Sequence, residues 1–570
     1  MSGFNPVEYV KGAYRNSPWV VISVAIHAIL FAGLSLWVIS KTIMTKDEPP
    51  AKVALAKPVE KVEAVIQPPE IIDRKAMPKN EEAEVVSYEE DVYMPTTQAT
   101  EEEDLHLDRG DPTALDNLPA GATGGTSIGV GAAGGHYGTG KASPFAGRRA
   151  GGGGKGRNIG KVEGTEKSVL EGLRWLIRHQ NADGSWSAAT LLSHCAAATP
   201  CVGADQKFTA NYDEGLTGLA LLAFLGAGYG HDAKETIVDT AMGKRYKLGE
   251  VITNGLKWLV ERQKEDGSFS ASRPFMYNEA LATLAVTEAY GLSGAKYWKK
   301  PAEKGVLFLL GAQKPNPSGT GMWGWRYASR QDIEGRHTAG TLDDTHYAEE
   351  MRDADVSATG WCVMALKSAE LSGIEVPREA LEGAVDYIKS MTAENGLVGY
   401  YDRALAGQPV KGVNDVFTYH ASVMSALGMC TRTFVTHDIE DPFLEQGAKQ
   451  IIKDLPTVSK DKLSIDYYYW YYATIALNQF DGPESPKKTN KYWGPWNEAM
   501  KDAIISLQDA TDKRDVCSRG GWLVGDRWCH YGGPIYATAI NTLTLEVYYR
   551  YPNAFGAGKR GGAVATEKPK

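Results

Sequence analysis

The sequence has no surplus of positive charge. Lys and Arg number 61 against 70 Asp and Glu, so the formal net charge is −9 at pH 7. Proteins that bind DNA or RNA normally present a basic face to the phosphates, and nucleic acid is therefore excluded from the expected partners. Hydrophobic residues make up 43% of the 570, which is enough to bury a large core.

Phosphate-binding loops are missing as well, although the chain contains 62 glycines. A nucleotide loop needs Gly-Lys-Ser/Thr between a strand and a helix, whereas "GTGKAS" at 138–143 has neither the strand nor the spacing. Residues 41–165 are first Pro-rich and acidic and then Gly-rich, so they bury too little apolar surface to fold. We expect a disordered linker over 41–165, with a root-mean-square span of about 60 Å, and a disordered tail over 554–570.

Charged residues are absent from one stretch near the N-terminus, residues 16–40. As a helix this stretch extends about 37 Å, which is long enough to cross a bilayer. Lys41 and Lys46 follow it without a small-residue cleavage site, which favours a retained anchor over a signal peptide. We expect a transmembrane helix over 18–40, and basic residues on both sides leave its orientation open.

His27 lies inside this expected helix, four residues after Ser23, so both share one helix face. A polar side chain in lipid tends to face a partner. The segment "SVAIHAILFAGL" resembles the anchor of TonB-type energy transducers, which carry Ser and His at this spacing. The resemblance implies a cytoplasmic segment over 1–17, a single pass through the inner membrane, a periplasmic remainder, and contact of Ser23 and His27 with ExbB and ExbD motor proteins. An anchor that merely tolerates His27 stays open as the alternative.

From residue 166 onward a pattern recurs. The segments "LEGLRWLIRHQNADGSWS" (170–187) and "TNGLKWLVERQKEDGSFS" (253–270) match almost position for position, and weaker copies begin at 303, 381, 444 and 497. Each copy is amphipathic and is followed by a stretch that is apolar on nearly every face, which predicts an outer helix and then a buried inner one. Six such pairs closing in a ring predict an all-α fold, an (α/α)6 toroid over 166–553.

The two clearest copies share Trp, Gln, Gly and an aromatic residue at matching positions. We expect Asp-Gly to form a turn, and Gln and Trp to tie the end of the outer helix to it. The pattern is similar to the QW repeat of squalene–hopene cyclases and to the repeats of protein prenyltransferase β-subunits, which implies a terpenoid cyclase-like toroid. The residues that carry this resemblance are Trp175, Gln180, Gly184, Trp186, Trp258, Gln263, Gly267 and Phe269.

Two aspartates stand in "MRDADVSATGW" (351–361). Squalene–hopene cyclases protonate an alkene with the third residue of an Asp-Val-Asp-Asp motif, so the resemblance implies that Asp353 matches the first position and Asp355 the acid. Val356 replaces the last Asp of the motif. Such an acid must be neutral and activated in a dry site, and Trp361 with "DYYYWYYATIAL" (466–477) offers aromatic faces to a carbocation.

Comparison of the chain with itself gives a second interpretation of Asp355. Acids recur near the expected starts of other inner helices, at Asp213, Asp415 and Asp466. An Asp at a helix start accepts backbone N–H bonds and contributes about 1 kcal/mol. We therefore favour a helix-capping role for Asp355 over an acid catalyst.

Metal ligands are suggested at two places. Asp515, Cys517 and His530 resemble the Asp-x-Cys pair and distant His that hold zinc in prenyltransferase β-subunits, although His530 follows much more closely here. In "LDDTHYAEEMRDAD" (342–355) Tyr347 stands where a diphosphate-binding Asp-Asp-x-x-Asp needs Asp, which leaves a solvated acidic loop or a Ca²⁺ or Mg²⁺ loop. We expect no organic cofactor, and Mg²⁺, Ca²⁺ and Zn²⁺ stay open.

The cysteines suggest two loop disulfides. Cys195 and Cys201 bracket one short loop, Cys517 and Cys529 bracket another, and the remaining two cysteines lie in expected inner helices. Two bridges and two buried thiols fit an oxidising compartment, although the pairing does not follow from sequence alone.

Three functions remain open. We favour a non-catalytic module that binds a lipid, glycan or protein ligand, because the acid motif is incomplete and cyclases of this type build their cavity between two α-domains. The alternative is an isoprenoid-acting enzyme, a cyclase or prenyltransferase relative, with Asp355 as general acid. A further alternative is a carbohydrate-active toroid with paired acids such as Asp353 and Glu350.

Overall fold

The computed structural model describes residues 165–550, except for 196–199, 204–205, 240, 272–273, 409–419, 421, 461, 463, 484 and 512–516. The expected anchor over 18–40 with Ser23 and His27, the linker before residue 165 and the tail over 554–570 lie outside the described residues, so they stay predictions. Among the helices of the described part, none is both long enough and apolar enough to cross a membrane.

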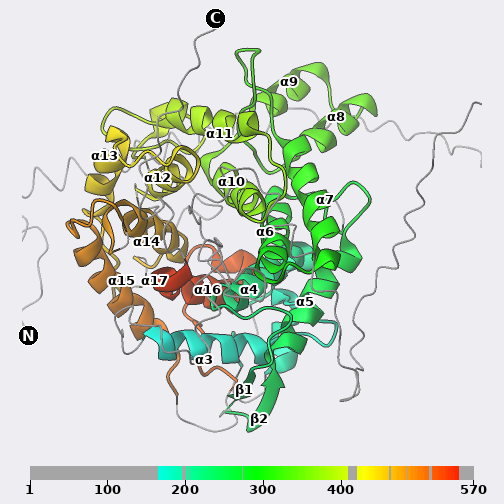
Figure 1. The fold of residues 1–570 in the computed structure, drawn as a ribbon, viewed down its shortest axis with the longest axis vertical. Coiled ribbons are helices and arrows are strands. Elements are labelled where there is room, and N and C mark those ends of the chain that lie inside the picture. The colour runs from blue at the N-terminus through cyan, green and yellow to red at the C-terminus, as the bar shows by residue number, and fades with distance from the viewer. Residues whose placement is uncertain are drawn as a thin grey trace, which may run out of the picture. The chain divides into compact units, whose positions relative to one another are not determined.

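The outer ring of the fold consists of amphipathic helices (Figure 1). In the first of them Leu173, Leu176 and Ile177 are buried while Glu166 and Lys167 are exposed, so the apolar side packs inward. The outer helices in the described chain are α3 (Thr165–Arg178), α5 (Leu248–Arg262), α7 (Lys296–Ala312), α11 (Arg378–Met391), α13 (Pro442–Ile451) and α15 (Trp493–Leu507).

The inner ring consists of helices that are buried nearly all round. In Val356–Leu371 every residue except Glu370 is buried, as the unbroken apolar pattern of the sequence predicts. The inner helices are α4 (Asp213–Gly226), α6 (Met276–Ser293), α10 (Val356–Leu371), α12 (Val423–Thr436), α14 (Tyr467–Asp481) and α16 (Cys529–Leu545), the last kinked at Gly533.

The inner helices close a ring. They pack in the order α4, α6, α10, α12, α14 and α16, and α16 packs back against α4 and against the outer helix α3. Each outer helix precedes its inner partner in the chain, and Figure 1 shows the two rings around one axis. The predicted all-α (α/α)6 toroid is therefore confirmed in the described residues.

Two insertions were not predicted, one between two hairpins and one within the third hairpin. The antiparallel strands β1 (Thr236–Asp239) and β2 (Lys244–Lys247) lie between α4 and α5. Helices α8 (Arg330–Thr338) and α9 (Asp344–Arg352) lie between α7 and α10. Short helical turns complete the described elements: η3 (Ala188–His194), η4 (Ala210–Tyr212), η5 (Arg403–Leu405) and α17 (Val547–Arg550).

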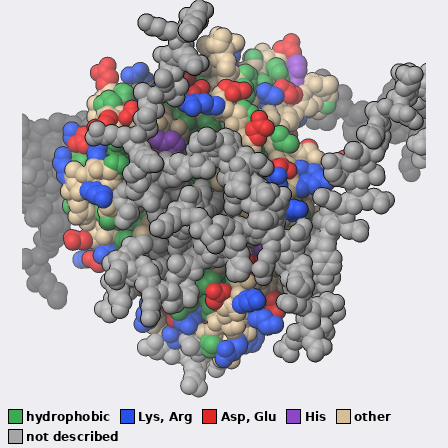
Figure 2. Space-filling view, in the orientation of Figure 1, with side chains coloured by type: hydrophobic (Ala, Val, Ile, Leu, Met, Phe, Trp, Pro, Cys, Tyr) green, Lys and Arg blue, Asp and Glu red, His purple; other side chains and the backbone are tan. Residues whose placement is uncertain are grey.

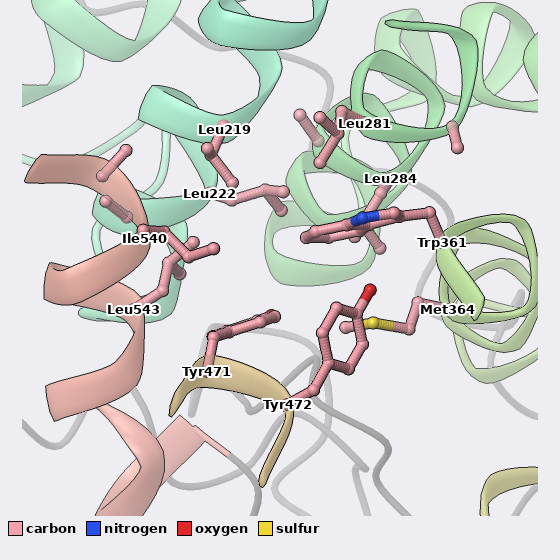
Figure 3. Packing of buried hydrophobic residues seen from close by; sticks show 14 of the residues in the cluster. Leu219, Leu222, Leu281, Leu284, Trp361, Met364, Tyr471, Tyr472, Ile540 and Leu543 are labelled. Carbon is pink, nitrogen blue, oxygen red and sulfur yellow. The ribbon is translucent and has the colours of Figure 1, made fainter. Parts of the chain in front are cut away.

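The centre of the ring is filled by side chains from the inner helices. Figure 3 shows leucines of α4 and α6 facing Trp361 and Met364 of α10, with aromatic rings of α14 and aliphatic side chains of α16 closing the group. Trp361 and Tyr471 stack with ring centroids 5.8 Å apart. The toroid is therefore a packed core at this level and not an open channel.

The repeat glutamines join neighbouring hairpins. Gln180 Nε2 donates to the carbonyl of Gly184 in its own turn and to that of Val251 on α5, both at 2.9 Å. Gln263 makes the two corresponding bonds, at 3.1 and 2.9 Å. The predicted role of the repeat glutamine is confirmed, and it extends to the next hairpin as well.

The repeat tryptophans act in the same region. Trp186 Nε1 donates to the carbonyl of Leu176 on α3 at 2.8 Å, and Trp258 Nε1 donates to Asp183 in the preceding turn at 3.0 Å. Gly184 adopts a φ of 94°, and a Cβ at this position would lie 2.4 Å from the carbonyl oxygen of Asn254. The Asp-Gly turn therefore requires glycine for its backbone conformation and for the close approach of α5.

The first and last hairpins are joined by the same kind of bond. Gln508 Nε2 donates to the carbonyls of Gly520 and of Ser168 on α3, both at 2.8 Å. Arg519 adds an ion pair to Glu171 at 3.2 Å. The ring is thus closed by a hydrogen bond from a glutamine side chain to a backbone carbonyl. Bonds of the same kind link Gln180 and Gln263 to the hairpins that follow them.

Charges of both signs are interspersed along the visible rim of the ring (Figure 2). Pairs such as Lys299 with Glu303 and Arg378 with Glu382 lie along single outer helices. Exposed pairs of this kind contribute little to stability. They give the described rim a mixed charge on the face shown.

Candidate functional site: an aromatic cavity

A cavity of about 850 Å³ opens where the N-terminal ends of the inner helices meet. Its wall includes residues from α4, α6, α10, α12, α14 and α16, together with Val202 and residues 206–208. Aromatic side chains dominate this wall, and among them are Tyr212, Phe275, Tyr277, Tyr327, Trp361, Tyr400 and Tyr468. A space of this size and lining is typical of a small-molecule site.

Hydroxyl groups gather on one side of the cavity. Tyr277 Oη donates to Ser357 Oγ at 2.7 Å, and Tyr468 hydrogen-bonds the same Ser357 hydroxyl. The hydroxyls of Tyr327 and Tyr400 lie 2.5 Å apart. Burial raises the pKa of Tyr277 and Tyr468, so both hydroxyls stay protonated and neutral.

Asp355 lies behind this wall and is not among the residues that line the cavity. It is the N-cap of α10: Oδ1 accepts from the backbone N–H of Ala358 at 2.7 Å, and the residue is fully buried. Its Oδ2 lies 3.5 Å from Nε of Arg326 and has no hydrogen-bond partner. The capping interpretation of Asp355 is confirmed.

Burial raises the pKa of Asp355 to about 7, while the Arg326 guanidinium opposes this shift. Arg326 also pairs with Asp353, at 3.3 Å, and lies over the ring of Tyr327 at 4.7 Å. Asp353 itself is half exposed at the end of α9. Sequence reasoning missed Arg326, although its place directly after the buried repeat Trp325 marks it as a charge next to the core.

Acids cap other inner helices as well. Asp466 Oδ1 accepts from the N–H of Tyr469 at 2.9 Å and caps α14. Asp213 lies at a helix start, as predicted, but it is the first residue of α4 and Tyr212 holds the cap position. Asp415 lies outside the described residues. The recurrence noted in the sequence is therefore structural at Asp355 and Asp466.

Asp526 is the buried acid that does line the cavity. Its oxygens accept from the N–H groups of Trp528 (2.9 Å), Cys529 (3.2 Å) and Tyr467 (2.9 Å) and from the hydroxyl of Tyr536 (3.4 Å). Burial, together with nearby Asp466, raises its pKa to about 7. Four donors engage the carboxyl oxygens, so the side chain holds the start of α16 in place.

The paired acids considered for glycoside chemistry do not face the cavity. Glu350 accepts from Arg336, with Nη1 at 3.0 Å, and Asp353 pairs with Arg326. Neither acid lines the cavity wall. Asp343 caps α9 by accepting from the N–H of His346 at 2.9 Å. Acids of the stretch over 342–355 thus serve as helix caps and ion-pair partners, and the choice between a solvated acidic loop and a Ca²⁺ or Mg²⁺ loop stays a prediction.

The structure corrects the predicted disulfides, since none of the six cysteines is in a disulfide bond. The pairs Cys195 with Cys201 and Cys517 with Cys529 are not formed. Instead, Sγ of Cys517 lies 3.4 Å from Sγ of Cys201. The short loops suggested local pairing, whereas the closed ring brings the last loop against the first.

The predicted zinc ligands Asp515, Cys517 and His530 stay a prediction as a set. Asp515 lies outside the described residues, and His530 places its Nδ1 2.7 Å from the carbonyl of Arg527, with its ring against Tyr531. Cys517 belongs to a different group, with His179, Cys195 and Cys201. Among the described residues, these four form the group whose ligand atoms lie close enough to hold one metal ion, all within 4.8 Å of one another.

Sequence reasoning missed His179, which stands directly before the repeat Gln180. The matching position of the second copy is Arg262, so the difference between the two copies was the available signal. The ring of His179 stacks on Trp175, with centroids 3.9 Å apart, and its Nδ1 lies 2.7 Å from the Trp175 carbonyl. The Nε2 atom therefore points toward the cysteines.

No protein-family profile matches the chain, and no curated protein does. Among solved structures, similar folds include the type II terpene cyclase MstE of Scytonema (12% identity, 68% of this chain and 97% of that chain, TM-score 0.42). They also include the GH76A α-1,6-mannanase of Salegentibacter sp. HEL1_6 (11%, 67% and 98%, 0.41) and the unsaturated glucuronyl hydrolase of Bacillus sp. GL1 (11%, 68% and 99%, 0.41). These neighbours are enzymes of the α/α toroid class, and we take the chemistry of this chain from its own side chains.

Proposed function

We propose that the chain is a membrane-tethered, non-catalytic module whose toroid binds an amphipathic, mainly apolar ligand in the aromatic cavity. The observation that carries the proposal is the composition of the cavity wall, in which aromatic rings surround a small group of tyrosine and serine hydroxyls. The rings suit an apolar chain, and the hydroxyls suit one polar end of it.

The positions of the buried aspartates support a binding role without catalysis. Asp355 is occupied as a helix cap behind the wall, and Asp526 on the wall is occupied by four donors. A general acid has to reach the reacting atom of the substrate. Asp355 does not line the cavity, and the oxygens of Asp526, which does, already accept from four protein donors.

The test uses the full-length protein in detergent, with squalene, geranylgeraniol and maltohexaose as separate probes. Leu281 lines the cavity, so the larger side chain in Leu281→Trp should narrow it and weaken binding of the apolar probes at least tenfold. The matched control is Leu307→Trp on α7, where Leu307 is 67% exposed, and it should bind like the unmodified protein. Equal binding by the Leu281→Trp variant, or binding of maltohexaose alone, would contradict the proposal.

A second candidate is an isoprenoid-acting enzyme with Asp355 as its acid. It is favoured by one observation: the pKa of Asp355 is raised to about 7 by burial, and its Oδ2 accepts no hydrogen bond. Incubation of the full-length protein with squalene and with geranylgeranyl diphosphate, followed by mass spectrometry, separates the two candidates. Products that disappear in Asp355→Asn would establish the enzyme, and unchanged substrates support the binding module.

The membrane part of the proposal places the helix over 18–40 in the inner membrane, with the toroid in the periplasm. The pair Ser23 and His27 on one helix face supports contact with ExbB- and ExbD-type motor proteins. Co-purification of such subunits should be lost in His27→Ala and kept in Ile26→Leu. An identical set of partners for both variants would refute the contact.

A further inference from the structure

We propose that His179, Cys195, Cys201 and Cys517 bind one Zn²⁺ ion, which clasps the first hairpin of the toroid to the last. The four residues come from three separate places: the end of α3, the loop after η3 and the loop before α16. Cys201 and Cys517 are 316 positions apart in the chain. Closure of the ring alone brings them together.

The distances fit tetrahedral zinc. Zn–S bonds of about 2.3 Å and Zn–N bonds of about 2.0 Å place neighbouring ligand atoms about 3.5–3.8 Å apart. Here Sγ of Cys201 lies 3.4 Å from Sγ of Cys517 and 3.5 Å from Nε2 of His179, and Sγ of Cys195 lies 3.9 Å from the same Nε2. The four atoms therefore surround a common centre with little rearrangement.

The histidine is already oriented as a ligand. A metal-bound imidazole normally donates its other N–H to a carbonyl or carboxylate, which fixes the tautomer. Nδ1 of His179 lies 2.7 Å from the carbonyl of Trp175, and the ring stacks on the Trp175 side chain. The proton then resides on Nδ1, and Nε2 presents its lone pair to the three sulfurs.

The sulfur atoms lie in a largely buried place with polar neighbours. Cys201 and Cys517 are buried, and Cys195 is half-buried. The backbone N–H of Cys201 donates to Sγ of Cys195 at 3.5 Å. The guanidinium of Arg178 lies next to the group, with Nη2 3.4 Å from the carbonyl of Cys517, and it also forms a buried ion pair with Asp239 at 2.9 Å.

Ligand chemistry selects the metal. Three thiolates and one imidazole suit Zn²⁺, whereas Mg²⁺ and Ca²⁺ prefer oxygen ligands. Four protein ligands fill a tetrahedral shell and leave no open position for water or substrate. The site is therefore structural, and it is independent of the ligand proposed for the cavity.

The proposed zinc site is also connected to the cavity through one loop. Cys201 is followed by Val202, Gln206, Lys207 and Phe208, which line the cavity wall. Fixing Cys201 against Cys517 holds this part of the wall against the last hairpin. Removal of the metal should therefore release the loop as well as loosen the closure of the ring.

The first measurement is the metal content of the full-length protein, purified without chelator. One zinc per chain is expected, with three sulfur ligands and one nitrogen ligand by X-ray absorption. Exchange with Co²⁺ should give the thiolate-to-cobalt and ligand-field bands of a tetrahedral site. These measurements use the unmodified protein, so they do not depend on whether a variant folds.

Variants then assign the ligands. Zinc content should fall at least tenfold in Cys201→Ser and in Cys517→Ser. It should stay at one per chain in the matched control Cys362→Ala, since Cys362 is buried in α10 away from the group. Unchanged zinc in Cys517→Ser would overturn the proposal. A zinc-free native protein with a disulfide between Cys201 and Cys517, found by peptide mapping without reductant, would overturn it as well.

Discussion

The carboxyl group of Asp355 matches a catalytic motif in the sequence, whereas in the structure it caps helix α10. It sits one residue before α10, accepts the N–H of Ala358 and faces Arg326. The resemblance to an alkene-protonating motif identified the position but could not place its side chain. That placement depends on Arg326, which the motif does not include.

The raised pKa of Asp355 predicts a pH dependence of stability. Its folded pKa of about 7 lies above the value of about 3.9 in an unfolded chain, so the folded state binds the proton more tightly. The free energy of unfolding should therefore fall as the pH rises from about 4 to about 7, by at most about 4 kcal/mol from this group. Urea unfolding of the toroid across this range measures it.

Asp355→Asn keeps an oxygen for the cap and removes the titration, so its stability should change less across the same range. Asp353→Asn serves as the control, because the Asp353 side chain is 45% exposed. Parallel pH curves for the unmodified protein and Asp355→Asn would show that the cap carboxyl does not titrate as argued.

At the scale of elements, the Asp-Gly turn fixes the angle between one hairpin and the next. Gly184 has a positive φ and lies against the backbone of α5, whereas Gly243, between β1 and β2, has a φ of 65° with nothing within 4 Å of its would-be Cβ. The two glycines share the left-handed conformation and differ in the space around them. Substituting each of them by alanine therefore distinguishes the cost of backbone strain from the cost of a steric clash.

Gly184→Ala should destabilise the toroid by more than about 3 kcal/mol, because a clash with the carbonyl of Asn254 adds to the strain of a left-handed alanine. Gly243→Ala should cost about 1–2 kcal/mol, the strain alone. Chemical denaturation of both variants gives the comparison. Equal losses would mean that α5 moves away from the turn without cost.

A substitution of Gln508, compared with a control substitution, tests the contact that closes the ring. Gln508→Leu leaves the carbonyls of Ser168 and Gly520 without their donor, and we expect a loss of about 2 kcal/mol. Gln450→Leu is the control, since Gln450 donates one exposed bond, to the carbonyl of Asn395, and should lose less than about 1 kcal/mol. A smaller loss in Gln508→Leu than in the control would contradict the closing role.

At the scale of the whole molecule, closure distinguishes this ring from an open array of repeats. In an open array each repeat contacts its neighbours alone, so an end repeat can be removed while the others stay folded. Here α16 contacts both α4 and α3. Removal of the last hairpin exposes the apolar faces of the first hairpin as well as the fifth.

A chain that ends at residue 491, before α15, should therefore lose cooperative unfolding. A chain that ends at residue 550 should unfold like the full-length protein, since it keeps every described element. Circular dichroism during urea titration follows both. A sharp transition with native helix content in the shorter chain would show that the hairpins fold as an open array.

Much of this architecture could be predicted from the sequence because the signal is local and repeated. Helical periodicity placed the outer and inner helices, and Asp-Gly with Gln and Trp located the turns. The insertion with α8 and α9 carries no repeat signal, and the partners of Cys517 lie more than 300 positions away. Contacts of that kind follow from the closure of the ring, so no short segment encodes them.

The closing contact also has a mechanical consequence. The chain enters the toroid at α3, and α3 is held to the last hairpin by Gln508, by Arg519 and by the side chains around Cys517. Tension applied through the chain before residue 165 is therefore borne first where the two ends of the ring meet. The stability of this contact would set the force at which the toroid opens. The other hairpins would bear the force only after the contact has broken.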